Sequence, residues 1–594
     1  MCAIFGVLGK LPTKEKFIYA RDTMTHRGPN DAGLYWDEKA RVALGHRRLS
    51  IIDLSEAGRQ PLFSNDGQFS VVFNGEIYNY LELRRELGKN YDFKTKTDTE
   101  VLLAAYSVWG EKCLEKLNGM FAFAIWDKKE EKLFCARDRL GIKPFFYFTQ
   151  GDTLYFASEI KALLALGIER EPNEHVIFQY LYYGFYDHSE ETFFKGVKNL
   201  PGGSFFVWKD GKFSISRFWD LADKEKDYSL LSEEKVHEKF EELLTDSIRL
   251  RFRSDVPVGI SLSSGLDSNI LLFYSTEVLK AKNIHLFSRC FRSEAYNECS
   301  LLDTYLREEQ KRMWHKSYFT PEDALPLIYE LNRVEDQPYG GFLTIGGYHL
   351  HKQTASLFAP VILEGQGLDE ILGGYKYYRM ELEKDASRGK NDASKNKGNR
   401  PSFSEYSQDT TALIDKNILN KKFISIYSEV PLSFHAPFES HLLNAQYQDL
   451  IYTKLPRVLR FNDHVSMSHA RELRMPYLDY RIVEFCFFLP AQYKIKGDER
   501  KVLAREVAKK YVPPAVYSKQ KKAYGAVQVE WLRRHYQKEV FSIIESPSFK
   551  SRKYWDHGAL RKRVENFYGG EGENSFFLWQ CINLELWFRE FIDK

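Results

Sequence analysis

Val256-Pro-Val-Gly-Ile-Ser-Leu-Ser-Ser-Gly-Leu-Asp-Ser268 is the stretch that decides the fold of this chain. The apolar run Val256–Leu262 predicts a buried strand, and the apolar residues from Ile270 to Leu279 predict a helix directly after the Ser/Gly turn. Strand, small-residue turn and helix open a doubly wound α/β domain, which binds nucleotides at the carboxyl ends of its strands. Pro360-Val-Ile-Leu followed by Glu364-Gly-Gln-Gly repeats the pattern.

The turn has the residue types of a phosphate site. Small side chains let backbone amides approach an anion, the helix start adds positive potential, and Ser263, Ser264 and Ser268 add hydroxyl donors. It lacks the lysine of a G-x-x-x-x-G-K-[ST] loop. A Ser/Gly turn after a strand is also a common structural feature, so both interpretations stay open at this point.

The segments around this domain differ in composition. Residues 233–253 predict an amphipathic helix, with an apolar face formed by Val236, Phe240, Leu243, Leu244, Ser247 and Ile248. Residues 220–232 are charged and lack apolar patterning, which is typical of a linker. Residues 1–220 show short β-type runs and one clear helix, Thr97–Trp109, and therefore predict a mainly antiparallel α+β domain. The chain from about Pro431 is predicted to be mostly helical, and residues 385–411, rich in Lys, Asn and Ser, predict a mobile insertion.

Composition excludes several classes of protein. With 594 residues the chain needs more than one domain, and 85 basic against 82 acidic residues give a net charge of +3, without the footprint of a nucleic-acid or anionic-membrane partner. The longest apolar run, Met120–Trp126, is too short to cross a bilayer. Seven cysteines without a C-x-x-C pair predict neither a disulfide framework nor a structural zinc site. We therefore expect a cytoplasmic enzyme in a reducing compartment.

The amino terminus offers a nucleophile. If Met1 is removed, Cys2 carries both a thiol and a free α-amino group, which has a pKa suited to act as its base. A site of this kind also needs groups that hold a zwitterion and an oxyanion. Arg48 suits a carboxylate, Glu76 and Asp98 suit an ammonium, and Asn74 with the Gly75 amide suits an oxyanion. Each also has an ordinary interpretation: Asn74-Gly75 as a turn, Asp98 as a helix cap and Arg48 as a surface pair.

Five ordered blocks show that the chain resembles the class II glutamine amidotransferases, and specifically the glutamine-hydrolysing asparagine synthetases. They are Cys2-Ala-Ile-Phe-Gly, His26-Arg-Gly-Pro-Asn-Asp-Ala-Gly, Gly45-His-Arg-Arg-Leu-Ser-Ile, Phe73-Asn-Gly-Glu-Ile-Tyr-Asn and Arg137-Asp-Arg-Leu-Gly-Ile-Lys-Pro. The resemblance implies an N-terminal nucleophile fold, an αββα sandwich, over residues 1–220. It also implies that Cys2 attacks glutamine, that Asn74 and Gly75 form the oxyanion hole, and that Arg48, Asn74, Glu76 and Asp98 bind glutamine.

Residues 221–594 resemble the ATP-pyrophosphatase-type synthetase domain of the same enzymes. The family pattern Ser-Gly-Gly-Leu-Asp-Ser differs here by Ser264 in place of the first glycine. The resemblance implies that ATP is cleaved between its α- and β-phosphates and that Mg²⁺ is held by Asp267 and Asp369. It places the ATP and pyrophosphate site at these residues: Leu262, Ser263, Ser264, Gly265, Asp267, Ser268 and Gly365.

Three further matches concern the acceptor and the adenylate. In Glu364-Gly-Gln-Gly-Leu-Asp-Glu-Ile-Leu-Gly-Gly-Tyr375, the family glutamate is Gln366 and the small residue before the aspartate is Leu368. The resemblance implies acceptor binding by Gln366 and Asp369, with both departures in the acceptor pocket. In Asp463-His-Val-Ser-Met-Ser-His-Ala-Arg-Glu-Leu-Arg-Met-Pro-Tyr-Leu-Asp479 the family arginine is His464. Lys521 aligns with the lysine that stabilises charge on the adenylate, although Lys519–Lys522 also reads as a surface basic cluster.

We therefore predict a glutamine-dependent amidotransferase that releases ammonia in its first domain and amidates an adenylated carboxylate in its second, with ATP and Mg²⁺. Ammonia must pass between the two sites without loss to water, which implies a sequestered path. Aspartate is the first expected acceptor, and a sugar uronic acid of surface-polysaccharide synthesis is the alternative, because relatives with that acceptor also resemble the chain at Asp336-Gln-Pro-Tyr-Gly-Gly. A non-enzymatic glutamine or nucleotide sensor is a third possibility. The resemblance further implies a homodimer whose only other partners are small molecules.

Overall fold

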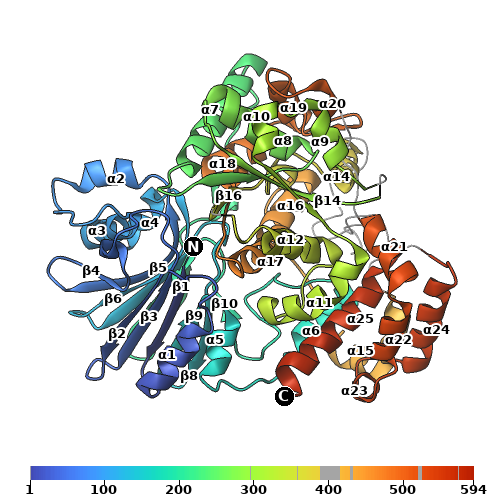
Figure 1. The fold of residues 1–594 in the computed structure, drawn as a ribbon. Helices are drawn as coiled ribbons and strands as arrows, with labels where there is room; N and C mark the ends of the chain where they lie inside the picture. The colour runs from blue at the N-terminus through green and yellow to red at the C-terminus, as the bar shows by residue number, and fades with distance from the viewer. Residues whose placement is uncertain are drawn as a thin grey trace.

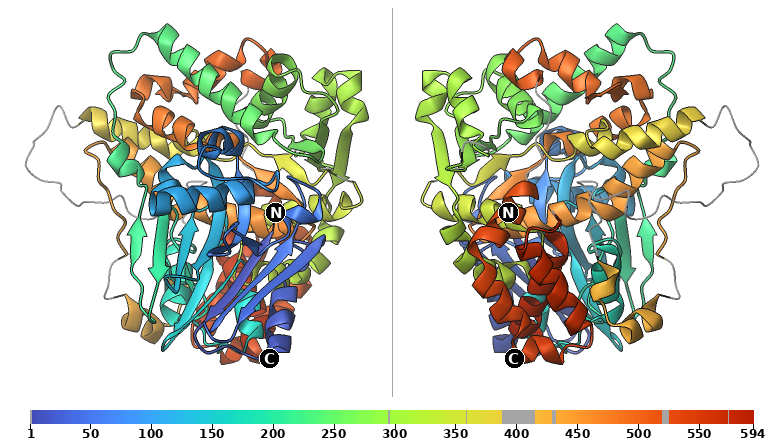
Figure 2. Two further views of the ribbon diagram at one scale, coloured as in Figure 1. Left: turned by 90° about the vertical axis from the view of Figure 1, so that its left-hand side faces the viewer. Right: turned by 90° about the vertical axis from the view of Figure 1, so that its right-hand side faces the viewer.

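The computed structural model describes residues 2–293, 296–357, 359–387, 415–428, 432–518, 525–572 and 574–594. Figures 1 and 2 show a β-rich amino-terminal half packed against an α/β half, with the carboxyl-terminal helices along one side of both. The amino terminus lies at the junction of the two halves. Buried residues from both halves, including Ile51, Tyr78, Ile248 and Met475, form one hydrophobic cluster across that junction.

The amino-terminal half contains two six-stranded antiparallel sheets. The first has the strand order β10 (Lys198–Asn199), β8 (Phe146–Gln150), β9 (Thr153–Ala157), β1 (Ala3–Leu8), β3 (Val42–Arg48) and β2 (Asp31–Asp37). The second has the order β12 (Ile215–Arg217), β11 (Ser204–Trp208), β7 (Lys132–Arg137), β6 (Gly119–Asp127), β5 (Phe69–Ile77) and β4 (Leu62–Phe63).

These two sheets stack face to face, and helices cover their outer faces. In β1, Ile4 and Leu8 point between the sheets, whereas Phe5 and Val7 pack against the helices, so that both faces of the strand are buried. Helices α1 (Lys14–Asp22), α5 (Ile160–Ala165) and α6 (Glu174–Tyr183) cover the first sheet, and α2 (Tyr80–Leu87), α3 (Asp98–Trp109) and α4 (Cys113–Lys116) cover the second. The expected αββα sandwich is confirmed.

Several details of the first half differ from the sequence prediction. The predicted helix Thr97–Trp109 is present as α3, but α1, α2, α5 and α6 were missed. Helix α1 shows why: only Phe17, Ala20 and Arg21 of its nine residues are buried, so it has hardly any apolar periodicity. Its packing against the first sheet, rather than its sequence pattern, stabilises it.

The second half is built on a five-stranded parallel sheet with the order β15 (Trp314–Tyr318), β14 (His285–Cys290), β13 (Val258–Ser261), β16 (Val361–Leu363) and β17 (Glu472–Arg474). The strand order reverses between β13 and β16, which creates a crevice beyond their carboxyl ends. Helices α7 (Glu233–Arg251), α8 (Leu266–Phe273), α11 (Pro321–Glu335), α12 (Phe342–Gln353) and α17 (Leu455–Met467) belong to this half. The expected doubly wound domain is confirmed.

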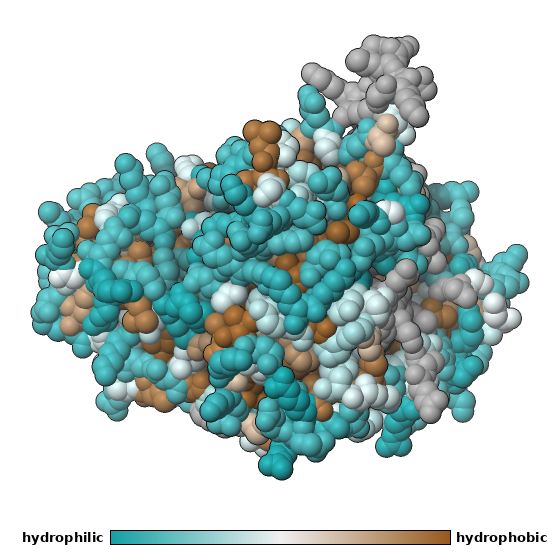
Figure 3. Space-filling model, turned by 90° about the horizontal axis from the view of Figure 1, so that it is seen from above, coloured by the Kyte–Doolittle hydropathy of each residue, from teal (hydrophilic) through white to brown (hydrophobic). Residues whose placement is uncertain are grey.

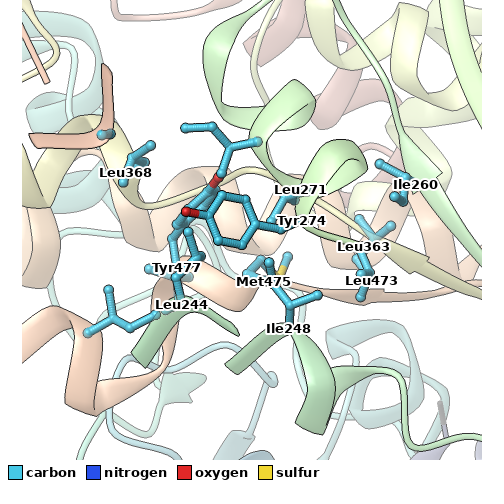
Figure 4. Packing of buried hydrophobic residues seen from close by; sticks show 14 of the residues in the cluster. Leu244, Ile248, Ile260, Leu271, Tyr274, Leu363, Leu368, Leu473, Met475 and Tyr477 are labelled. Atoms are coloured by element: carbon cyan, nitrogen blue, oxygen red, sulfur yellow. The ribbon is translucent and has the colours of Figure 1, made fainter. Parts of the chain in front are cut away.

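Helix α7 illustrates how the sheet is covered. All six residues of its predicted apolar face are buried. Figure 4 shows Leu244 and Ile248 close to Met475 and Tyr477, which follow β17. Helix α8 begins at Leu266, earlier than predicted, and continues as a wider turn over Tyr274–Val278.

The remainder is mostly helical, as predicted. The other helices are α9 (Cys299–Tyr305), α10 (Glu308–Arg312), α13 (Leu368–Ile371), α14 (Lys376–Ser387), α15 (Lys421–Tyr427), α16 (His441–Gln448), α18 (Tyr480–Phe488), α19 (Val502–Ala508), α20 (Pro514–Tyr517), α21 (Gly525–His535), α22 (Gln537–Ile544), α23 (Pro547–Ser551), α24 (His557–Tyr568) and α25 (Phe576–Trp587). Strands β18 (Ile495–Lys496) and β19 (Glu499–Arg500) form a hairpin.

Two further expectations concern the insertion at residues 385–411 and the cysteines. The first three residues of the predicted insertion, 385–387, end helix α14, where the Asp385 carboxylate accepts hydrogen bonds from the start of α16; residues 388–411 lie outside the described residues. Cys290 and Cys299 are disulfide-bonded, with Cα atoms 5.7 Å apart, a single pair that the prediction of no disulfide framework did not include. The fold places the end of β14 beside the start of α9, which cysteine spacing did not reveal.

The molecular surface fits the balanced composition. The face in Figure 3 is mainly hydrophilic, with hydrophobic residues in small separate groups. Among the helices of the described ranges, none is long and apolar enough to cross a membrane.

Candidate active sites

Cys2 lies in a pocket of the amino-terminal half. Its backbone nitrogen donates a hydrogen bond to Asn74 Oδ1 at 3.2 Å, and its Sγ lies 3.9 Å from the Leu49 carbonyl oxygen. Burial raises the pKa of the Cys2 thiol, and the nearby Arg48 guanidinium opposes that shift. The thiol therefore requires a base to become a nucleophile. The pocket lining includes all the residues predicted to hold glutamine except Asn74, and it consists of Cys2, Arg48, Leu49, Ile51, Ile52, Gly58, Gln60, Phe73, Gly75, Glu76, Thr97, Asp98 and Thr99.

Asn74 is on β5 and is fully buried. Its Oδ1 is used by the Cys2 nitrogen, whereas its Nδ2 has no hydrogen-bond partner within the described part of the chain. A buried amide donor without a partner is costly unless a ligand uses it. Asn74 and Gly75 belong to the β5–β6 ladder rather than to a turn, which corrects the ordinary interpretation of this dipeptide.

Gly75 is required for close packing of this strand. Its φ is +153°, and a Cβ at this position would lie 2.0 Å from the Met120 carbonyl oxygen of β6. No larger residue fits without moving β5 and with it Asn74.

Arg48 is buried, not part of a surface pair. Its guanidinium donates to the carbonyl oxygens of Ser55 at 2.7 Å and of Asp53, which orient it. No ion pair of Arg48 is found in the described ranges, so its charge is available for a carboxylate. Gly58 makes room for it, because a Cβ there would lie 1.9 Å from Arg48 Nη2.

Asp98 and Glu76 place two buried carboxyl groups at the same pocket. Asp98 opens α3, whose cap is Thr97 rather than Asp98, and its Oδ2 accepts a hydrogen bond from the Ile77 nitrogen at 2.9 Å. Burial raises the pKa of Asp98 to about 7 and the pKa of Glu76 well above its usual range, with the Glu472 carboxylate adding to both shifts. A bound cation would stabilise both carboxylates and so offset the burial that raises their pKa values.

The Ser/Gly turn after β13 is highly ordered by its own hydrogen bonds. Ser263 N donates to Ser268 Oγ at 3.1 Å, and Asn269 Nδ2 donates to the carbonyl oxygens of Ser263 and Gly265 at 2.9 and 2.8 Å. The side chain of Leu262 is buried in the core, so Leu262 offers only its backbone to a ligand.

Ser264, the departure from the family pattern, is accommodated by a partner that the sequence did not reveal. Its Oγ donates to Glu298 Oε1 at 2.8 Å, and its backbone nitrogen lies 3.3 Å from Glu298 Oε2. A carboxylate thus sits at amide and hydroxyl donors of the kind that bind phosphate. Glu298 follows β14, and no local pattern in the sequence links it to this turn.

Asp267 and Asp369 come together at the carboxyl ends of β13 and β16. Lys501 Nζ lies 2.7 Å from Asp267 Oδ2 and 2.7 Å from Asp369 Oδ1, so one cation bridges both carboxylates. Carboxylate oxygens that already share one cation are a suitable donor set for Mg²⁺, which uses one or two carboxylates together with phosphate oxygens. The two predicted metal ligands therefore fit that ion.

Lys501 is a candidate that sequence reasoning missed. It directly precedes α19, with φ of +56°, and is buried. One lysine in the basic segment 494–501 carries no local signal that separates it from its neighbours; only the fold brings it to the two aspartates. Lys521, the predicted lysine, lies outside the described residues, and its role stays a prediction.

The acceptor loop lies against the Ser/Gly turn. A Cβ on Gly365 would lie 3.0 Å from Asp267 Cβ, so this glycine permits the contact. Gln366 is half-buried and has no side-chain hydrogen bond in the described chain segments. Leu368 is fully buried in the hydrophobic cluster, where Figure 4 shows it, so its side chain has no exposed surface for a ligand. The effect of both departures on an acceptor stays a prediction.

Two other matched motifs lie between the halves. Asp463 pairs with Arg27 at 2.8 Å and Lys143 at 3.4 Å, and Asp336 pairs with Lys161 at 3.2 Å. His464 is fully buried beside the Val334 carbonyl oxygen, and burial lowers its pKa to about 3, so it is neutral where the family has a cation. These residues contribute to the contact between the two halves.

Comparisons with known proteins agree with this geometry. The sequence matches the family "Glutamine amidotransferase domain" over residues 1–219 and the family "Asparagine synthase" over residues 239–589. "Asparagine synthetase [glutamine-hydrolyzing] 1" of Bacillus subtilis is 30% identical, over 98% of this chain and 97% of the relative. "Asparagine synthetase [glutamine-hydrolyzing] 3" of the same organism is 30% identical over 88% and 87%, and "Amidase chry2" of Gibberella zeae is 25% identical over 92% and 90%. The chain belongs to the asparagine synthase family and is a glutamine-dependent, asparagine synthetase-like ligase.

Proposed function

We propose that this protein forms asparagine from aspartate, glutamine and ATP, with glutamine hydrolysis in residues 1–220 and amide synthesis in residues 221–594. The observation that carries the proposal is the Cys2 pocket. In and beside it, a cysteine is surrounded by an amide donor that has no acceptor among the described residues, a buried arginine that has no carboxylate among the described ion pairs, and two destabilised carboxyl groups. These groups match the oxyanion, the α-carboxylate and the α-ammonium of glutamine respectively.

In the first half-reaction, Cys2 Sγ attacks the glutamine side-chain carbonyl carbon after removal of Met1. The α-amino group of Cys2 takes the thiol proton and passes it to the leaving nitrogen, so that ammonia departs and a thioester remains. Asn74 Nδ2 and the Gly75 nitrogen donate to the oxyanion as charge develops. Water then hydrolyses the thioester to glutamate and regenerates the thiol.

In the second half-reaction, an oxygen of the aspartate β-carboxylate attacks the α-phosphate of ATP, and pyrophosphate leaves. Ser263, Ser264 and Gly265 offer hydroxyl and amide donors to the phosphates, and Asp267 and Asp369 would hold Mg²⁺. When bound, Mg²⁺ supplies Lewis-acid neutralisation of the leaving pyrophosphate. Lys501, released from the two aspartates, stabilises charge on the phosphate. Ammonia then displaces AMP from the acyl-adenylate and leaves the amide.

Transfer of ammonia between the sites is also part of the proposal. Charged pairs between the halves, such as Arg27–Asp463, are fully buried and exclude bulk water from the junction. Ammonia that stays out of water is not protonated and remains a nucleophile.

A second acceptor is favoured by one observation. Gln366 is a neutral amide where the family has a glutamate, and an amide pairs with hydroxyl groups as readily as with an amino acid. A sugar uronic acid would need such neutral donors and acceptors. The chemistry and the first half-reaction would be the same with either acceptor.

One incubation tests both candidates. Purified protein receives glutamine, ATP, Mg²⁺ and aspartate, and glutamate, asparagine, AMP and pyrophosphate are followed by mass spectrometry. Asparagine with equimolar AMP supports the proposal; glutamate release without asparagine contradicts aspartate and directs the search to uronic acids. In the Cys2→Ala control, glutamine-dependent synthesis is lost and synthesis from ammonium chloride remains. If wild type releases no more glutamate than Cys2→Ala, the chain is a sensor rather than a glutaminase.

A further inference from the structure

The edge strand of the synthetase sheet reaches the glutamine pocket. Strand β17 is fully buried and contributes Glu472 and Arg474 to the junction between the halves. Arg474 Nη2 lies 3.2 Å from Glu76 Oε1, and Arg474 Nε lies 2.6 Å from Glu472 Oε1. The carboxylate assigned to the glutamine ammonium is therefore held by a residue of the other half.

The backbone of the same arginine holds the acceptor loop. The Glu364 nitrogen donates to the Arg474 carbonyl oxygen at 2.9 Å, at the point where β16 ends. The next residue is Gly365, which packs on Asp267 of the ATP site. One residue thus contacts both Glu76 in the first half and the start of the ATP and acceptor loop in the second.

Arg474 is fixed in place by further contacts. Its Nη1 donates to the carbonyl oxygens of Arg251 and Arg253 at 2.8 and 2.7 Å, at the end of α7. Because the guanidinium is planar and multiply bonded, it cannot shift at Glu76 without disturbing its other partners. A displacement at one of these contacts is passed to the others.

The charge balance explains why glutamine would act on this contact. Three buried carboxyl groups, those of Glu76, Asp98 and Glu472, lie in the field of the Arg474 guanidinium, and the amino-terminal charge also acts on Glu76. The arriving ammonium of glutamine adds a positive charge to this carboxyl-rich group and lies against the Glu76 carboxylate that Arg474 holds in position.

We propose that Arg474 is a positioning residue that couples the two sites, because it shares Glu76 with the glutamine ammonium and holds Glu364 at the start of the acceptor loop. The inference rests on the proposed binding of glutamine by Glu76. It requires that ATP and the acceptor tighten the binding of glutamine and that glutamine in turn tightens the acceptor site by the same factor. At subsaturating glutamine the tighter binding appears as faster glutamine hydrolysis.

The test compares wild type with Arg474→Lys, which keeps the charge but loses the planar guanidinium that contacts Glu76, Glu472 and two carbonyl oxygens at the same time. Glutamate release is measured with and without ATP, Mg²⁺ and aspartate, and AMP formation is measured with ammonium chloride. We expect ATP and aspartate to stimulate wild type by at least about five-fold. In Arg474→Lys the KM for glutamine rises about ten-fold or more, because a hydrogen bond to a charged group is lost, and the stimulation falls below about two-fold. Ammonia-dependent AMP formation stays within about two-fold of wild type.

The matched control is Glu174→Gln, which removes another ion pair between the halves, Lys553–Glu174 at 3.0 Å, without touching Glu76 or the partners of Arg474. It should keep the full stimulation. Stimulation that survives in Arg474→Lys, or is absent in wild type, overturns the coupling. If Arg474→Lys also loses ammonia-dependent AMP formation, Arg474 has a merely structural role, and this result too overturns the coupling. A KM for glutamine unchanged in Glu76→Gln instead refutes the glutamine assignment itself.

A second measurement does not depend on the variant folding. Wild type is alkylated at the Cys2 sulfur with the glutamine analogue 6-diazo-5-oxo-norleucine, which loses N₂ and leaves a thioether, and hydrogen exchange is followed in peptides that contain Glu364. The Glu364 amide donates to Arg474, so its exchange should slow by at least about three-fold. Unchanged exchange of this amide contradicts the coupling.

Discussion

Replacing Asn74 by aspartate separates oxyanion stabilisation from folding. Asn74 Oδ1 accepts the Cys2 backbone N–H at 3.2 Å, and aspartate can keep that bond. The Nδ2 donor, which has no partner in the described ranges, is replaced by an oxygen that repels an oxyanion. The variant therefore changes the proposed catalytic donor and leaves the structural contact.

The expected loss follows from one oxyanion donor. Removing such a donor costs about 2.7–4 kcal/mol of transition-state stabilisation, or about 10²–10³ in kcat. Because the proposed function assigns ground-state binding of glutamine to Arg48, Glu76 and Asp98, the KM for glutamine should change by less than about three-fold. Glutamate release is measured by a coupled assay over a range of glutamine concentrations.

Two controls accompany the variant. Synthesis of AMP from ammonium chloride should remain at the wild-type rate, since Asn74 is remote from the ATP turn. Asn30→Asp makes the same chemical change at an exposed asparagine whose Oδ1 accepts from Ser50 N, and its kcat should match wild type. If Asn74→Asp keeps kcat within about three-fold, or loses it only through a raised KM, the oxyanion assignment is wrong.

Four further outcomes are expected. Lys501→Met should lower AMP formation by about 10²-fold or more and leave glutamine hydrolysis measured without ATP and aspartate unchanged, whereas the exposed Lys496→Met should change neither. If AMP formation is lost in Lys521→Met instead, the lysine chosen from the sequence is restored. The KM for glutamine should fall as pH rises through about 7, because the pKa of Asp98 is raised to about 7 and only the ionised carboxylate attracts an ammonium. If the KM of Asp98→Asn still changes over this pH range, a group other than Asp98 causes the change. Ligand-free stability should decrease over the same rise, from about pH 4 to 7, since the native state binds the proton more tightly than the unfolded chain. Gly75→Ala should lower the free energy of unfolding in urea by about 2–4 kcal/mol. Gly67→Ala, where a Cβ meets open space, should lower it by about 1 kcal/mol. Equal losses would show that the close strand contact at Gly75 is unimportant.

Some parts of this protein are determined locally and could be predicted from sequence. The apolar face of α7 and the Val256–Ser268 strand, turn and helix follow from periodicity and turn chemistry, which act over a few residues. Helices with little periodicity, such as α1, escaped prediction because tertiary packing stabilises them.

The candidate sites divide in the same way. The sequence by itself named Cys2, Arg48, Asn74, Glu76, Asp98, Asp267 and Asp369, because each stands in a recognisable local block, and the fold brings the first five around one pocket. Only the tertiary structure decided that Lys501 bridges the two aspartates, that Glu298 meets Ser264 and that Arg474 meets Glu76. These partners are far apart in the chain and join through the parallel sheet and the packing of the two halves. Electrostatic attraction depends on distance in space, and no local pattern records it.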